Sequence, residues 1–133
     1  MMPEQVNSQN NMSRVVLIAD DEEPIAQALS MIVEDYGYQA LIATNGKQAL
    51  DLARSHRPVL VLTDLMMPLM SGTELIATLR ADAEQEGQRP PPMVLMSAAG
   101  KVYTTPAGAD AVLAKPFDIR QIEALLDLFL APR

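Results

Sequence analysis

Residues 58–68 read PVLVLTDLMMP, an apolar run between two prolines that stops at a carboxylate, Asp64. A run of about four to eight apolar residues between breakers is typical of a strand buried on both faces, as in a parallel sheet. Open α/β sheets bind their ligands at the carboxyl ends of the strands. We therefore expect Asp64 to lie where such a protein carries its chemistry.

Three further apolar runs end in a similar way. They cover residues 15–19, 93–96 and 111–114, and they stop at Asp20-Asp21, at Ser97 and at Lys115-Pro116. A short strand at 39–43 completes the set, and helical patterns fill the intervals at 23–36, 46–55, about 72–86 and 119–129. The alternation of strand and helix predicts an α/β fold, with one parallel five-stranded sheet covered on both faces.

The helical patterns also predict which side chains face inward. In the first helix these are Ile25, Ala28, Leu29, Ile32, Val33 and Tyr36, and in the last Ile119, Ile122, Leu125, Leu126 and Phe129. Leu128 and Leu130 lie off the stripe of the last helix. Asn45, Ser71 and Asp118 are suited to cap helices, the last two as capping boxes with Glu74 and Gln121.

Two regions lack a regular pattern. Residues 1–12 are polar and rich in Asn and Gln, and we expect a disordered lead-in ahead of one domain at 13–131. Between 98 and 110, the residues Gly100, Pro106 and Gly108 are poor helix material. A helix between the last two strands is therefore expected to be shortened or irregular.

Composition excludes several classes of protein. The 133 residues contain no cysteine, so disulfides and thiolate metal sites are ruled out. The net charge of −7, with no basic cluster, argues against direct nucleic-acid binding. No run approaches the roughly 20 apolar residues of a membrane helix. Without a signal-peptide pattern, the cytoplasm is the expected location.

The polar residues at the strand ends form a coherent chemical set. Asp20, Asp21 and Asp64 should meet at one edge of the sheet, where their mutual repulsion favours a shared cation. Oxygen ligands of this kind suit Mg²⁺. Lys115 adds a positive charge and Ser97 a hydroxyl, which together indicate phosphoryl transfer with Asp64 as the acceptor. Singly, each signal has a commoner explanation, such as a helix cap or a turn, and only their joint occurrence favours a functional site.

Four motifs together resemble the receiver domain of two-component response regulators. They are ADDE at 19–22, TDLMMPLMSG at 63–72, MSA at 96–98 and AKPF at 114–117, in this order over residues 13–131. The resemblance implies a flavodoxin-like (βα)5 three-layer sandwich with strand order 2-1-3-4-5. It also implies a chain that catalyses only its own phosphorylation and dephosphorylation.

The resemblance assigns a role to each site residue. Asp64 would accept a phosphoryl group from a phosphohistidine on a sensor histidine kinase or a phosphotransfer protein. Ser97 and Lys115 would contact the phosphoryl oxygens, and the Lys115-Pro116 bond would be cis. The ligands of Mg²⁺, or of Mn²⁺ in its place, would be Asp21 and Asp64 directly, Asp20 largely through water, and the backbone carbonyl of Met66.

Some positions depart from the family pattern. Val112 stands where many members carry a Tyr or Phe that moves on activation, so we expect the route from the phosphoryl group to the output surface to differ from the one usual in the family. Met66 and Ala99 are apolar where members tune hydrolysis of the acyl phosphate, and we expect slow self-dephosphorylation.

Alternative functions follow from the same residues. A constitutive protein–protein interaction module on a receiver fold is the main one. A hydrolase of the haloacid-dehalogenase type would need a second aspartate where Met66 stands. The expected protein is a monomer or weak dimer that switches the binding of a downstream protein or relays phosphate.

Overall fold

The computed structural model describes residues 14–98 and 108–130; strands and helices alternate as far as residue 98, and one strand and one helix follow from residue 108. The elements are β1 (Val15–Ala19), α2 (Glu23–Asp35), β2 (Gln39–Ala43), α3 (Gly46–His56), β3 (Leu60–Asp64), α4 (Gly72–Gln85), β4 (Met93–Ala98), β5 (Ala111–Lys115) and α5 (Ile119–Phe129). The five predicted strands and the helices predicted at 23–36, 46–55, about 72–86 and 119–129 are present, with ends within two residues of the sequence pattern.

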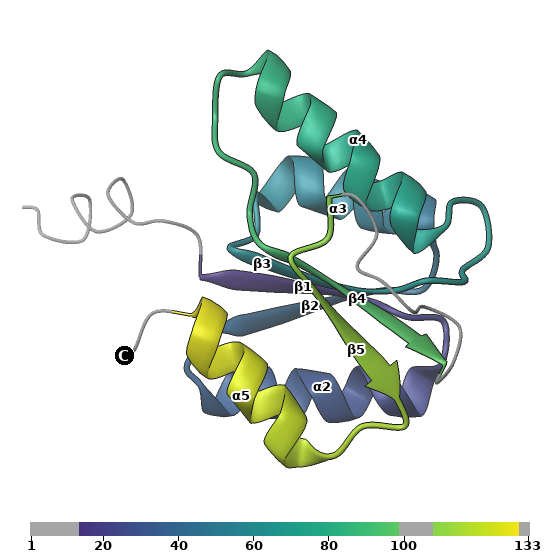
Figure 1. Ribbon diagram of the computed structural model, residues 1–133, viewed down its shortest axis with the longest axis vertical. Helices are drawn as coiled ribbons and strands as arrows, with labels where there is room; N and C mark the ends of the chain where they lie inside the picture. The colour runs from purple at the N-terminus through teal and green to yellow at the C-terminus, as the bar shows by residue number, and fades with distance from the viewer. Residues whose placement is uncertain (1–13, 99–107, 131–133) are drawn as a thin grey trace, which may run out of the picture.

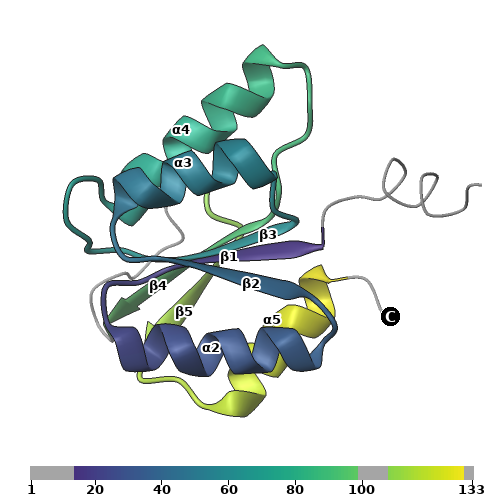
Figure 2. The ribbon, with the colours of Figure 1, turned by 180° about the vertical axis from the view of Figure 1, so that it is seen from behind.

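All strands of the sheet are parallel, and their order is β2-β1-β3-β4-β5. Helices α2 and α5 cover one face, whereas α3 and α4 cover the other (Figures 1 and 2). The predicted flavodoxin-like three-layer arrangement is therefore confirmed. The register pairs Ala19 with Thr63 and Ser97 with Ala114, so the residues that follow these pairs lie at the same edge of the sheet.

The central strands are buried on both faces, which explains their continuous apolar runs. Alternate residues of each strand belong to different core clusters. On one face Val16 and Leu62 pack in a cluster that includes Leu29 of α2 and Leu126 of α5. On the other face the cluster comprises residues such as Leu17, Leu50, Val61, Ile76 and Leu95.

The predicted caps are present. The Asn45 side chain accepts a hydrogen bond from the Gln48 N–H, and Ser71 and Asp118 form reciprocal capping boxes with Glu74 and Gln121. These local bonds satisfy backbone donors that have no partner within the helix. The starts of α3, α4 and α5 are thus determined by short-range chemistry.

Three expectations about inward-facing side chains were wrong. Ala28 is exposed, and Ala26 is buried in its place, because the stripe of α2 is centred on Leu29 and Val33 and Ala28 lies about 100° round the helix from Leu29. Ile119 is 60% exposed at the first turn of α5. Leu130 is buried, because α5 ends at Phe129 and the extended backbone at Leu130 turns its side chain onto the core.

Other predictions concern residues outside the described part. The lead-in at 1–12 lies there, as does most of the interval 98–110, including Ala99. The described end of that interval leads from Gly108 directly into β5. None of the described helices has the length and apolar character needed to cross a membrane.

Candidate functional site

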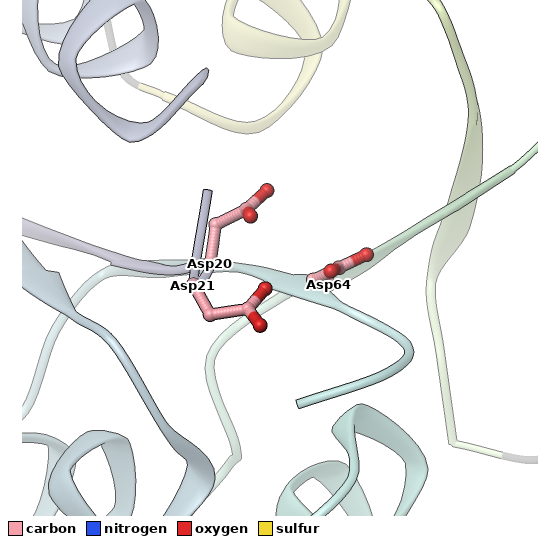
Figure 3. A group of neighbouring side chains, drawn as sticks. All are labelled: Asp20, Asp21 and Asp64. Atoms are coloured by element: carbon pink, nitrogen blue, oxygen red, sulfur yellow. The ribbon is translucent and has the colours of Figure 1, made fainter. Parts of the chain in front are cut away.

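Three aspartates meet at the carboxyl edge of the sheet. Asp20 and Asp21 follow β1, and Asp64 is the last residue of β3. One ligand oxygen from each lies within 4.8 Å of the others, and Figure 3 shows the three side chains next to one another. Asp20 and Asp64 are buried, whereas Asp21 is exposed. The parallel register produces this cluster from residues far apart in sequence.

Lys115 supplies a positive charge to the cluster from the end of β5. Its Nζ lies 3.0 Å from Asp20 Oδ2 and 3.3 Å from Asp64 Oδ1. The Asp20 carboxylate is held from its other side, because Oδ1 accepts the Glu22 N–H at 2.9 Å. Asp64 Oδ1 also accepts the Leu65 N–H at 3.0 Å. From the described residues, the second oxygen of Asp64 accepts no hydrogen bond, which leaves it available to react.

The pKa values of this group reflect burial and crowding. Burial, followed by the charge of Asp20, raises the pKa of Asp64, and Lys115 offsets only part of that rise. Burial alone would lower the pKa of Lys115, but Asp20 and Asp64 outweigh it and the net shift is upward. Lys115 therefore stays charged, and a further cation at the cluster would favour the ionised form of Asp64.

Ser97 lies at the same edge, near the end of β4. Its side chain is buried, and its hydroxyl donates to the Ala98 carbonyl at 3.3 Å rather than to Asp64. The pairing of Ala98 with Lys115 places Ser97 one residue before the level of the lysine. The pairing of Met96 with Asp64 likewise places Ser97 one residue beyond the level of Asp64 on the neighbouring strand.

The loop after Asp64 is held close to the site. Gly72 donates to the Leu65 carbonyl at 2.8 Å, and a Cβ at Gly72 would collide with the Asp64 carbonyl oxygen. Leu69 adopts a positive φ of 73°, which a non-glycine residue rarely does. The Met66 side chain is 72% exposed. The tight start of α4 thus positions the backbone of Asp64 and leaves the Met66 side chain in solvent.

Glu22 is a residue of the site to which the sequence pattern assigned no role. Its carboxylate Oε2 lies 3.5 Å from Lys115 Nζ. Its place directly after Asp20-Asp21 was a sequence signal for a role in the site, although a glutamate at the start of a helix is usually just exposed to solvent. Its contact depends on β5 lying near the start of α2, which local pattern does not reveal. The Lys115-Pro116 bond is cis, as the resemblance implies.

The fold and the site together define a flavodoxin-like α/β protein with an aspartate cluster and a lysine at the carboxyl edge of its sheet. The response regulator receiver domain family matches residues 16–127, and the chain belongs to that family.

Curated relatives support the same assignment. The chain is 33% identical over 121 residues to the response regulator Rre1 of Synechocystis, a match that covers 87% of this chain and 51% of Rre1. It is 34% identical over 123 residues to the phosphate regulon transcriptional regulatory protein PhoB of Pseudomonas aeruginosa, covering 90% of this chain and 52% of PhoB. The chain spans about half the length of these relatives.

A solved structure shows the same architecture. The chemotaxis response regulator CheY4 of Vibrio cholerae superposes with a TM-score of 0.74 at 27% identity, and the match covers 90% of this chain and 100% of that one. The likeness therefore extends over the whole of a solved response regulator.

Proposed function

We propose that this receiver domain accepts a phosphoryl group on Asp64 from a phosphohistidine of a sensor histidine kinase or a phosphotransfer protein. The observation that carries the proposal is the environment of Asp64. This buried carboxylate has one oxygen that accepts no hydrogen bond from any described residue, a lysine 3.3 Å from the other oxygen, and two aspartates beside it. The membership of the receiver family supports the same role.

The transfer follows from the ordinary chemistry of a carboxylate nucleophile. An Asp64 oxygen forms a bond to phosphorus as the bond from phosphorus to the imidazole nitrogen breaks, and the electron pair of that bond stays on the nitrogen. The product is an acyl phosphate on Asp64. Lys115 stabilises the charge on the phosphoryl oxygens, and Ser97 exchanges the Ala98 carbonyl for one of them as its hydrogen-bond acceptor.

The acidic cluster fits a divalent cation. Three carboxylates against one ammonium leave two negative charges in a partly buried site, and all available ligand atoms are oxygens. Asp20, Asp21, Asp64 and the Met66 carbonyl would hold Mg²⁺, or Mn²⁺ in its place. When bound, the ion neutralises charge on the incoming phosphoryl oxygens.

The consequence of phosphorylation in this proposal is a change in the binding of another protein or the onward relay of the phosphoryl group, in the cytoplasm. The only catalysis would be self-phosphorylation and self-dephosphorylation. The name of PhoB describes a transcriptional regulator, but this chain spans about half of PhoB, and no such output is assigned to it. The alternative of a constitutive interaction module is not favoured, because the complete set of site residues is present in a family member.

Acetyl phosphate or beryllofluoride, each with Mg²⁺, tests the proposal. We expect either reagent to shift the amide spectrum of the wild type around Asp64, and intact mass to rise by one phosphoryl group with acetyl phosphate. Asp64→Asn should show neither change, and Asp51→Asn, on the exposed face of α3, should behave as the wild type. If the wild type does not respond, or if Asp64→Asn responds equally, the constitutive module becomes the better description.

A further inference from the structure

Glu22 occupies the N-cap of α2 without capping it. Its side chain makes no capping hydrogen bond, although side chains at this position normally accept one from the first turn. Instead its backbone N–H donates to Asp20 Oδ1 at 2.9 Å, and its carboxylate approaches Lys115 at 3.5 Å. One residue therefore contacts two members of the site, through its backbone and through its side chain.

The Lys115 ammonium is shared among carboxylates of unequal exposure. It lies 3.0 Å from Asp20, 3.3 Å from Asp64 and 3.5 Å from Glu22. The first two side chains are almost fully buried, whereas that of Glu22 is 59% exposed. An ammonium has three N–H donors, so these carboxylates can engage all of them while Asp64 is unmodified.

A phosphoryl group on Asp64 would bring new anionic oxygens that compete for the same donors. Of the present partners, Glu22 is the one released at lowest cost, because water can solvate its exposed carboxylate as soon as the lysine leaves. Asp20 has no such replacement, since its side chain is 0% exposed.

We propose that Glu22 is a positioning residue that holds Lys115 in the unphosphorylated state and yields it to the phosphoryl oxygens. Its charge then has opposite effects on the two kinds of ion that the site takes. It weakens the binding of anions at Asp64, because it competes for Lys115, and it strengthens the binding of cations at the acidic cluster. This inference rests on the function proposed above and adds a residue that regulates the site.

Glu22→Gln tests the inference because it removes the charge and keeps the size of the side chain. Amide shifts of the full chain would report the affinity for Mg²⁺ alone, and then the affinity for beryllofluoride at saturating Mg²⁺. We expect Mg²⁺ affinity to fall about two- to fivefold and beryllofluoride affinity to rise about two- to fivefold, as suits a partly exposed ion pair. A merely structural role would weaken both.

Two matched variants separate the lysine contact from general charge. Glu23→Gln removes the same unit charge from the next residue, whose exposed side chain forms no salt bridge with any described residue. We expect Glu23→Gln to change the affinity for Mg²⁺ or for beryllofluoride by less than half as much as Glu22→Gln does. Glu22→Asp keeps the charge on a shorter side chain, and it should leave Mg²⁺ affinity unchanged while beryllofluoride affinity still rises.

The remaining outcomes overturn the inference. Equal effects of Glu22→Gln and Glu23→Gln would mean that only overall charge matters. Affinities that fall together, or that do not change, would exclude competition for Lys115. If the wild type binds both ions and the variants match it, the proposed function stands and this inference fails. If the wild type binds no beryllofluoride, both fail.

Discussion

The Lys115 ammonium lies 3.0 Å from the buried Asp20 carboxylate, and this contact joins the end of β5 to the end of β1 across β3 and β4. It is the closest ion pair of the site among the described residues. Asp20 is fully buried, and among the described residues its carboxylate contacts this lysine and accepts a hydrogen bond from the Glu22 N–H.

Lys115→Met should destabilise the fold in the absence of divalent cations. The variant leaves buried negative charge without its partner, which costs about 3 kcal/mol in comparable cases. Urea unfolding at neutral pH would measure the loss, and excess Mg²⁺ should recover part of it by supplying the missing positive charge. Lys47→Met, at an exposed site on α3, should have little effect. Equal stability of Lys115→Met and the wild type would contradict the importance of this contact.

Asp64→Asn should stabilise the fold at neutral pH. The pKa of Asp64 is raised in the folded state, so the folded protein loses stability as pH rises from the ordinary aspartate pKa, about 3.9, through the higher folded value. The advantage of the variant should therefore be present at neutral pH and vanish below about pH 3.9. Thermal unfolding across this range, without Mg²⁺, would reveal it. An advantage that grows toward acid would reverse the assigned direction of the pKa shift.

Tyr36 should titrate above the ordinary tyrosine pKa of about 10. Its hydroxyl donates to Asp127 Oδ1 at 2.8 Å and to the Glu123 carbonyl at 3.2 Å, which ties α2 to α5. The hydrogen bond to Asp127 is the main cause that raises the pKa of Tyr36 to about 12. The contribution of the protonated Tyr36 hydroxyl to the stability of the fold is complete below the ordinary tyrosine pKa of about 10. It is lost as pH rises through about 12. Absorbance at alkaline pH should show a tyrosine that titrates near pH 12 in the wild type, that is absent in Tyr36→Phe, and that titrates at a lower pH in Asp127→Asn.

Gly72→Ala should disturb the site as well as the fold. The added Cβ would meet the Asp64 carbonyl oxygen, so either α4 or the end of β3 must move, at a cost of more than about 2 kcal/mol. Gly87→Ala is a suitable control, because its positive φ costs only about 1 kcal/mol and no atom lies within 4 Å of the new Cβ. Urea unfolding and Mg²⁺ affinity would both be measured. The expectation fails if the two variants have the same free energy of unfolding and bind Mg²⁺ equally well.

The acyl phosphate of the wild type should be long-lived. Met66 exposes an apolar side chain two residues after Asp64, where it cannot orient a water molecule for attack. After removal of acetyl phosphate, the half-life of the phosphorylated wild type should be many minutes or longer. Met66→Asn should shorten this half-life. A wild-type half-life of seconds would rule out this effect of Met66.

The sequence by itself determined the elements, their caps and the polar residues at the strand ends. These features depend on short-range chemistry: the period of apolar residues, the breakers at 58 and 68, and side-chain oxygens such as that of Ser71, which bonds within its own turn. Because parallel strands end at a common edge, the meeting of Asp20, Asp21 and Asp64 followed from the same patterns.

Only the tertiary structure decided the contacts that depend on how elements pack. The Glu22 carboxylate meets Lys115 from 93 positions away in the chain, and Tyr36 meets Asp127 from 91. The burial of Leu130 and the exposure of Ile119 likewise follow from where α5 ends and how it lies on the sheet. A helix period shows which side chains share a face, whereas the partner of that face is set by packing in three dimensions.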